Sequence, residues 1–213
     1  MKKYVIFDLW YTLIYLDEGW KTFNILKEEF NIPKNQWVKE VKQLFLCNEY
    51  CDEKSFLIDF VKITGTDLDI KKYANILRDQ KKYDLSHIKT YQDVMPALKQ
   101  IKLSGYNLGI LSNQCTFYEP WFNNNIISQQ FDVVIFSNNV GVRKPNPDIY
   151  KIFLDKACVH PKDCIMIGDN IGQDVNTPKS LEMSAIHLDR KNNSRNSIKT
   201  LDEAVYRIAN KSY

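Results

Sequence analysis

The sequence lacks any hydrophobic run long enough to cross a membrane. No apolar stretch approaches the about 20 residues that a membrane-spanning helix needs. The chain begins Met1-Lys2-Lys3 and then turns apolar, as secretory signals do, but Asp8 interrupts the apolar run. No small-residue cleavage site follows it. We therefore expect a cytoplasmic protein that makes no contact with a membrane.

Cysteine, histidine and net charge are also scarce. The five cysteines are odd in number and irregularly spaced, which argues against a disulfide framework. The three histidines show no metal-ligand spacing. A net charge of +3 over 213 residues, with lysines spread along the chain, gives no basis for nucleic-acid binding. Internal repeats are absent, and no feature of the sequence indicates an oligomeric state.

What the chain does have is enough apolar material for a packed core. Hydrophobic residues make up 44% of the sequence and aromatic residues 13%, and the length fits one core domain with a modest insertion. Short apolar runs alternate with helical patterns, which predicts an α/β fold with a parallel, doubly wound sheet. We expect strands near residues 3–8, 106–111, 133–136, 164–167 and 185–188, and helices near 93–103, 147–157 and 201–209.

Residues 17–83 interrupt this alternation with helical patterns alone. Four segments place apolar residues at helical spacing, and the fourth follows Thr66-Asp67-Leu68-Asp69, which has the form of a capping box. We therefore predict a core domain formed by residues 1–16 and 84–213 and a helical domain formed by 17–83. The aromatic residues of this insertion are expected to pack mainly in its own interior: Trp20, Phe23, Trp37 and Phe45.

Polar residues follow four of the expected strands directly. In an open α/β sheet, side chains at the carboxyl ends of the strands face a common cleft, where ligands bind. The cleft would thus contain a carboxylate, a hydroxyl, a lysine and a pair of carboxylates. In chain order, the residues concerned are Asp8, then Ser112 and Asn113, then Lys144 in Gly141-Val142-Arg143-Lys144, and then Asp169 and Asp174.

These motifs, in this order, resemble those of the haloacid dehalogenase-like (HAD) hydrolase superfamily, over about residues 1–15 and 90–190. The resemblance implies a Rossmann-like core and a helical cap that closes over the site. Asp8 would be the nucleophile, because a carboxylate can attack phosphorus and form an aspartyl-phosphate. Asp8 and Asp169 would bind Mg²⁺, which prefers oxygen ligands from one or two carboxylates. In the family, the backbone carbonyl at the position of Trp10 is a further ligand.

The remaining motif residues have expected roles around the phosphate. By resemblance, Asp174 would hold a metal-bound water or fix Lys144, although it could instead only cap the helix after Gly172. Ser112 and Asn113 would bind phosphate oxygens, and Lys144 would neutralise charge on the nucleophile and on the transferring group. Thr12 would contribute to phosphate binding or orient the loop around Asp8, with a turn or capping role as the alternative.

The first motif departs from the phosphatase pattern at two positions. Trp10 stands where family phosphatases have an aspartate that protonates the leaving oxygen and later activates water, and Tyr11 stands where glycine is usual. Indole is a hydrogen-bond donor only, and general acid–base catalysis typically contributes ~10²–10⁴-fold. We therefore predict a Mg²⁺-dependent phosphatase or phosphotransferase of small phosphorylated metabolites whose turnover is slow.

Two other hypotheses remain open. The bulk of Trp10 and Tyr11 could partly fill the cleft, and a positive φ at Tyr11 would be costly, which favours a non-catalytic protein that binds a phosphorylated ligand or has a regulatory role. Haloacid dehalogenases of the superfamily also lack the second aspartate, because halide leaves without a proton. Against a dehalogenase, Asp169 and Asp174 would serve no purpose together without a cation.

Overall fold

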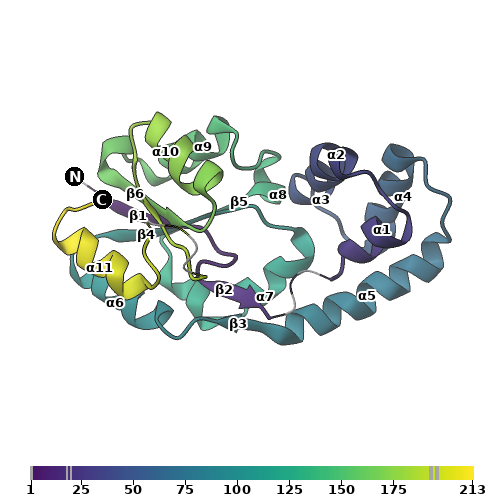
Figure 1. Ribbon diagram of the computed structural model, residues 1–213, viewed down its shortest axis with the longest axis horizontal. Helices are drawn as coiled ribbons and strands as arrows, with labels where there is room; N and C mark the ends of the chain where they lie inside the picture. Colours follow the sequence, from purple (N-terminus) through teal and green to yellow (C-terminus); the bar gives the residue numbers. More distant parts are fainter. Residues whose placement is uncertain (1, 18, 20, 192–193, 195–196) are drawn as a thin grey trace.

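The computed structural model describes residues 2–17, 19, 21–191, 194 and 197–213. Its centre is a five-stranded parallel sheet with helices on both faces (Figure 1), which confirms the predicted α/β class. The strand order is β5-β4-β1-β6-β7. The strands are β1 (Tyr4–Phe7), β4 (Asn107–Ser112), β5 (Val133–Phe136), β6 (Cys164–Gly168) and β7 (Ser184–His187).

Strand β1 lies at the middle of this sheet, between β4 and β6. All four of its residues are buried: Val5 and Phe7 join the core on one face of the sheet, and Tyr4 and Ile6 join the core on the other. A strand buried on both faces is expected to be continuously apolar, as this one is. The backbone N–H of Asp8 then donates to the carbonyl of Ile167 at 2.9 Å, so Asp8 is fixed at the carboxyl edge of the sheet.

Helices α6 (Val94–Leu103) and α11 (Leu201–Ala209) cover one face, and α9 (Pro147–Ala157) and α10 (Thr177–Ser180) cover the other (Figure 1). The bounds predicted for the helices at 147–157 and 201–209 are confirmed. Asn146 caps α9 and Thr200 caps α11 through their side chains. Six shorter helical segments lie between the strands: η2 (Thr116–Tyr118), α7 (Glu119–Asn123), η3 (Ile126–Gln130), α8 (Ser137–Val140), η4 (Pro161–Asp163) and the π-helical η5 (Ile171–Asn176).

The insertion is a group of helices beside the sheet (Figure 1). It comprises α1 (Asn24–Glu29), α2 (Lys34–Gln36), the π-helical η1 (Trp37–Val41), α3 (Lys42–Leu46), α4 (Glu53–Thr64) and α5 (Ile70–His87). No strand occurs among its described residues, and Trp20 lies outside them. Helix α5 is capped by Asp69, not by Thr66 as the capping-box pattern suggested, and it continues past residue 83. The division into two domains remains a prediction.

A small hairpin joins the insertion to the sheet. Strand β2 (Ile14–Leu16) pairs antiparallel with β3 (Ile88–Thr90), just before and just after the insertion. No strand was expected at either position, because three-residue strands show no alternation of their own. Tyr15 stacks on Tyr91 with ring centroids 4.4 Å apart, and the N–H of Tyr91 donates to Leu13 at 3.1 Å. The hairpin therefore holds both ends of the insertion beside the loop after β1.

Two buried features connect the insertion to the core. Phe56 of α4 lies at the centre of an aromatic cluster that includes Phe117 of the core segment η2. Asp84 of α5 accepts hydrogen bonds from the hydroxyl groups of Thr22 at 2.6 Å and Tyr118 at 2.8 Å. A buried carboxylate needs such partners to offset its lost hydration.

In the described part of the chain, no helix combines the length and hydrophobicity needed to cross a membrane.

Candidate active site

A buried lysine joins two aspartates at the carboxyl edge of the sheet. The ammonium of Lys144 donates to Asp8 Oδ1 at 2.8 Å and to Asp174 Oδ1 at 2.7 Å. The Lys144 side chain is only 1% exposed. Burial by itself disfavours the charged ammonium, but the negative charges of Asp174 and Asp8 outweigh it and raise the pKa of Lys144 above its ordinary value. The lysine is therefore held as a cation between the two carboxylates.

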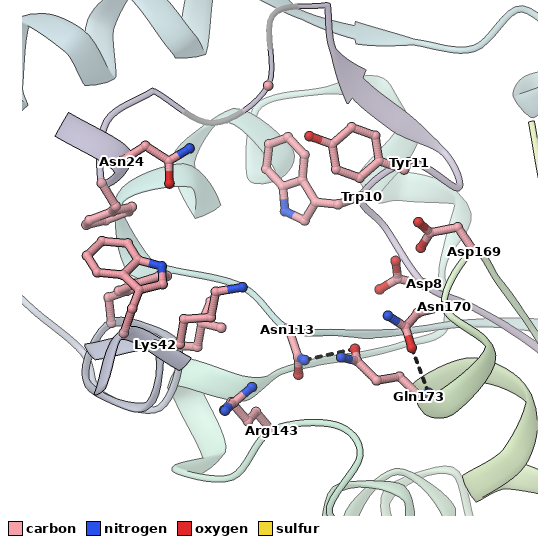
Figure 2. A pocket seen from close by; sticks show the side chains of 15 residues that line it. Asp8, Trp10, Tyr11, Asn24, Lys42, Asn113, Arg143, Asp169, Asn170 and Gln173 are labelled. Carbon is pink, nitrogen blue, oxygen red and sulfur yellow. Dashed lines mark hydrogen bonds between the residues drawn. The ribbon is translucent and has the colours of Figure 1, made fainter. Parts of the chain in front are cut away.

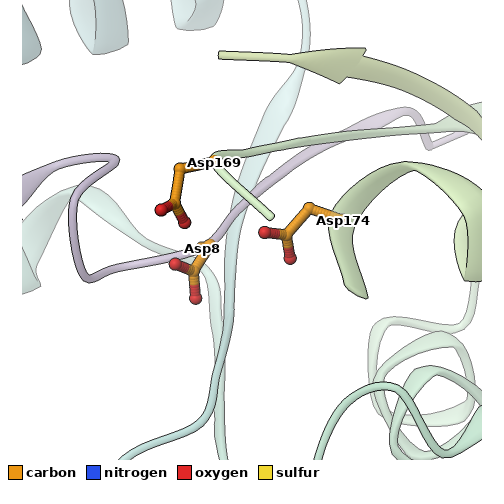
Figure 3. A group of neighbouring side chains, drawn as sticks. All are labelled: Asp8, Asp169 and Asp174. Carbon is orange, nitrogen blue, oxygen red and sulfur yellow. The ribbon is translucent and has the colours of Figure 1, made fainter. Parts of the chain in front are cut away.

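Asp169 completes a group of three carboxylates, which point toward one another (Figure 3). Ligand oxygens of Asp8, Asp169 and Asp174 lie within 4.8 Å of one another. Burial, and then the negative charges of Asp8 and Asp174, raise the pKa of Asp169 to about 7. Burial likewise raises the pKa of Asp174, although Lys144 opposes the shift. The group thus concentrates more negative charge than one lysine neutralises.

The three carboxylates differ in how many of their oxygens already accept hydrogen bonds from the protein. Asp174 uses Oδ1 for Lys144, and its Oδ2 accepts a hydrogen bond from the backbone N–H of Asn170 at 3.0 Å. Asp8 uses Oδ1 for Lys144, and among the described residues no cation forms an ion pair with Asp169. Oδ2 of Asp8 and the Asp169 carboxylate are therefore the better placed to bind a cation directly. Oxygen ligands from two carboxylates suit Mg²⁺.

The helical segment after Gly168 shows why Asp174 is not merely a cap. The side chain of Asn170 caps η5, because it accepts from the N–H of Gln173 at 3.0 Å. Asp174 instead packs back over the end of β6. A Cβ atom at Gly168 would lie 2.4 Å from the carboxylate of Asp174, so only glycine leaves room there. The interpretation of Asp174 as a cap alone is wrong, since its carboxylate holds Lys144.

The residues expected to bind phosphate fall into two groups. Ser112 and Thr12 are fully buried, their hydroxyl groups have no hydrogen-bond partner among the described residues, and neither residue lines the cavity. Asn113 lines the cavity, but its side chain donates to the carbonyl of Lys144 at 3.0 Å and accepts from its N–H at 2.8 Å. Asn113 therefore positions Lys144.

A cavity of about 530 Å³ opens from the carboxylates toward the insertion (Figure 2). Asp8 and Asp169 are the only carboxylate residues among the described residues that line it. Three aromatic residues that we expected to pack mainly inside the insertion are buried, but they also form part of the cavity wall: Phe23, Trp37 and Phe45. Insertion and core thus enclose one site together.

Trp10 and Tyr11 border this cavity without filling it. Trp10 is 6% exposed, and its indole N–H donates to Gln114 Oε1 at 3.2 Å. Tyr11 has a φ of +58°, in the left-handed region that glycine occupies at least cost. The turn is closed by a hydrogen bond from the N–H of Tyr11 to Ile14 at 2.7 Å. Tyr11 therefore adopts the positive φ that we expected to be costly for this residue.

Arg190 was missed by the sequence analysis. Its guanidinium donates to the carbonyl of Thr12 at 2.8 Å, forms an ion pair with Asp93 at 3.0 Å and lies 3.7 Å from the ring centroid of Tyr91. These contacts hold the loop that carries Trp10 and Tyr11. Arg190 follows the fifth strand of the sheet, so the rule applied to the other strands, that polar residues just after a strand reach the cleft, could have found it.

The sequence matches the family described as haloacid dehalogenase-like hydrolase over residues 5–188. It is 26% identical over 128 residues to the glyceraldehyde 3-phosphate phosphatase of Methanopyrus kandleri, an alignment that covers 59% of this chain and 54% of that protein. The chain thus spans about half the length of this relative.

Two solved structures share the fold. A HAD family enzyme from Bacteroides thetaiotaomicron, in complex with magnesium and inorganic phosphate, superposes with a TM-score of 0.63 at 18% identity, covering 89% of this chain and 95% of that one. A 2-haloacid dehalogenase from Pseudomonas syringae pv. Tomato has a TM-score of 0.64 at 17% identity, covering 99% and 100%. At these identities the structures show a common fold, and the fold accommodates both kinds of enzyme.

Proposed function

The chain belongs to the haloacid dehalogenase-like hydrolases, and on that premise we propose that it transfers the phosphoryl group of a small phosphorylated metabolite, first to Asp8 and then to water, with Mg²⁺ as cofactor. The observation that carries the proposal is the group formed by Asp8, Asp169 and Asp174 around Lys144, at the inner end of the cavity. A relative that is a phosphatase, and a structural neighbour that binds magnesium and phosphate, support it.

The contacts of Asp8 suit a nucleophile. Lys144 fixes the Asp8 carboxylate through Oδ1; in the transfer, a bond would form between one carboxylate oxygen of Asp8 and phosphorus while the bond from phosphorus to the leaving oxygen breaks. Bound beside Asp8 and Asp169, Mg²⁺ would neutralise the charge that otherwise keeps a carboxylate and a phosphate apart. The charge of Lys144 acts in the same direction. Water then hydrolyses the aspartyl-phosphate and regenerates Asp8.

Trp10 determines which substrates this chemistry suits. The indole N–H is already donated to Gln114, and no carboxylate other than Asp8 and Asp169 faces the cavity from the described residues. No side chain in the place of the missing aspartate protonates a leaving alkoxide or activates the attacking water. Acyl and aryl phosphates, whose leaving groups need no proton, should therefore phosphorylate Asp8 well, and hydrolysis of the intermediate should limit turnover.

Rapid-quench kinetics with acetyl phosphate, with the adduct followed by mass spectrometry, test the proposal. Wild-type protein with Mg²⁺ should accumulate a phosphorylated form, and Asp8→Asn should form none, because an amide does not attack. Asp169→Ala should lose the Mg²⁺ dependence together with the adduct, whereas the exposed Asp155→Ala should retain both. Trp10→Asp should accelerate loss of the adduct, within the ~10²–10⁴-fold range of general acid–base catalysis.

The same experiment separates the two alternatives. Absence of an adduct in wild type, with none gained in Trp10→Asp, would favour a protein that binds a phosphorylated ligand without turnover. The cavity removes one argument for that outcome, namely that Trp10 and Tyr11 fill the cleft, because about 530 Å³ stays open beside them. Halide release from a 2-haloacid without Mg²⁺ would instead indicate a dehalogenase, a reaction in which three converging carboxylates have no evident use.

A further inference from the structure

Two cations line the cavity on the side opposite the carboxylates. Lys42 begins helix α3 of the insertion, and Arg143 immediately precedes Lys144 in the core. Figure 2 shows both side chains on the wall that faces Asp8 and Asp169 across the cavity. The cavity is therefore polarised: negative carboxylates lie at one end and two positive groups at the other.

Neither cation has an acidic partner among the described residues. Arg143 donates from Nε to Gln43 Oε1 at 3.1 Å and from Nη2 to the carbonyl of Val38 at 3.1 Å, both of them neutral acceptors. Lys42 forms no ion pair within that part of the chain. Burial, and then the nearby charges of Arg143 and Lys27, lower the pKa of Lys42. Two positive groups are thus held near each other without a counter-charge.

Two other partly buried cations of this chain are paired, whereas Lys27 and Arg207, which are also partly buried, form no ion pair among the described residues and do not line the cavity. Lys81 in α5, with a side chain 22% exposed, forms an ion pair with Glu53, and Arg190, 12% exposed, pairs with Asp93. Partly buried charges are expected to have such partners, because desolvation is costly. Lys42 and Arg143 differ from Lys27 and Arg207 because both line the cavity, where an anion that enters from outside the chain would give them the partner that Lys81 and Arg190 have within it.

The apolar residues that line the cavity limit what such an anion can belong to. Phe23, Trp37 and Phe45 line the cavity beside Lys42, and they offer apolar ring surface. A cavity of about 530 Å³ accommodates a compact metabolite. The ligand should therefore have a phosphate at one end, a short carbon segment in the middle and a second charged group at the other end.

We propose that the substrate is a small phosphate ester with a second anionic group, a carboxylate or a second phosphate, which Lys42 and Arg143 bind at the end of the cavity opposite Asp8. This inference rests on the proposed function, because it identifies the other end of the same substrate. Arg143 and Lys144 are adjacent in sequence, so one segment of the core would contact the far anion through the first residue and orient the nucleophile through the second.

Esters of equal carbon chain length provide the test. Propyl phosphate has a neutral end, 3-(phosphonooxy)propanoate a carboxylate, and propane-1,3-diyl bisphosphate a second phosphate. The measured quantity is the ratio of kcat/KM for each charged-end ester to that for propyl phosphate. We expect wild type to prefer at least one charged end, and Lys42→Met to lower that ratio about tenfold, because a hydrogen bond to a charged group is lost.

Two control variants make the result specific. Lys42→Arg keeps the charge and should retain the preference, and Lys39→Met removes an exposed lysine from the neighbouring turn and should leave the ratio unchanged. The larger of the two charged-end ratios identifies carboxylate or phosphate as the second anion. Equal ratios in wild type and Lys42→Met would overturn the proposal, and would mean that the two cations only attract the phosphate that is transferred.

Calorimetry on Asp8→Asn with Mg²⁺ separates this inference from the proposed function. If wild type forms no adduct with acetyl phosphate, the proposed function fails, and if the alkyl esters are hydrolysed too slowly to measure, because their leaving groups need a proton, binding still decides the second-anion site. A charged-end ester that binds at least tenfold more tightly than propyl phosphate, with the difference lost when Lys42→Met is added, supports the site. Equal affinities for the neutral and charged esters overturn it.

Discussion

The two ends of the cavity are built on different principles. At the inner end, Asp8 and Asp169 directly follow strands β1 and β6, and Lys144, in the loop after helix α8, donates hydrogen bonds to both Asp8 and Asp174. At the outer end, helices of the insertion contribute ring surfaces and a lysine that has no acidic partner in the described chain. At the inner end, the hydrogen bonds of Lys144 are thus formed before any ligand arrives, whereas under our proposal the charges at the outer end are paired only by the ligand.

This difference separates chemistry from selection. Pre-organised charges stabilise a transition state without reorganisation, so the reacting groups benefit from being fixed on a rigid sheet. The outer groups lie on helices that pack through side chains, where substitutions can alter the shape and charge of the cavity without disturbing the carboxylates. The same inner end could therefore serve different substrates in proteins whose insertions differ.

Lys144→Met should produce the largest change, because it removes the cation between Asp8 and Asp174. Breaking a buried ion pair leaves uncompensated charge and costs about 3–5 kcal/mol. Urea denaturation of metal-free protein at pH 8 measures this loss. Lys151→Met is the matched control: its pair with Asp148 has the same kind of geometry, at 2.9 Å, but both side chains are at least 60% exposed. Comparable losses in the two variants would contradict the distinction between the two kinds of site.

The pH dependence of stability should be smaller and should originate at the inner end. The pKa of Asp169 is raised to about 7, so the folded state binds this proton more tightly than the unfolded state does. Stability is then gained as the pH falls through 7 and approaches its full value near the unfolded pKa of about 3.9. Partial exposure of Asp169 limits the effect, and we expect a rise in melting temperature of about 2–4 °C between pH 8 and pH 5.5.

Differential scanning calorimetry of the metal-free protein measures that rise. Asp169→Asn should flatten the dependence, because the titrating group is gone, and saturating Mg²⁺ should also flatten it, because the metal competes with the proton. If the melting temperature of Asp169→Asn depended on pH as strongly as that of wild type, a group other than Asp169 would be responsible for the dependence.

Lys42→Met should have the smallest effect on stability, and one of opposite sign to Lys144→Met. Methionine retains much of the side-chain volume and removes a cation that lies near Arg143 and has no acidic partner among the described residues. We expect the ligand-free protein to gain about 0.5 kcal/mol or less, since the lysine is only partly buried. A loss of about 2 kcal/mol or more in urea denaturation would mean that Lys42 has a stabilising partner in the free protein, and the contrast between the two ends would fail.

Sequence patterns predicted the inner end far better than the outer one. Strand β5 and helices α9 and α11 were located to the residue, because each has a clear pattern and turn or capping residues at its ends. The polar residues after the strands then converge, because parallel strands share one edge. The hairpin of β2 and β3 was missed, since three residues are too few to show alternation.

Helix faces carry no comparable signal for the outer end. Lys42 is one of many lysines in the insertion, and only the fold distinguishes it from those that face solvent. Arg143 was visible beside Lys144, but nothing in the sequence indicates that its guanidinium contacts Gln43 and Val38, about 100 residues earlier. Such contacts depend on how the insertion lies against the core, which local periodicity does not encode.

The hydrogen bond from Trp10 to Gln114 has a consequence for an aspartate introduced at position 10. Gln114 Oε1 also accepts from the N–H of Cys115, and the Gln114 side chain is buried. An aspartate at position 10 would place a carboxylate where an indole donor now meets an acceptor, and the neighbouring Tyr11 would still have to adopt a positive φ. Trp10→Asp alone should therefore recover only part of the ~10²–10⁴-fold contribution of general acid–base catalysis.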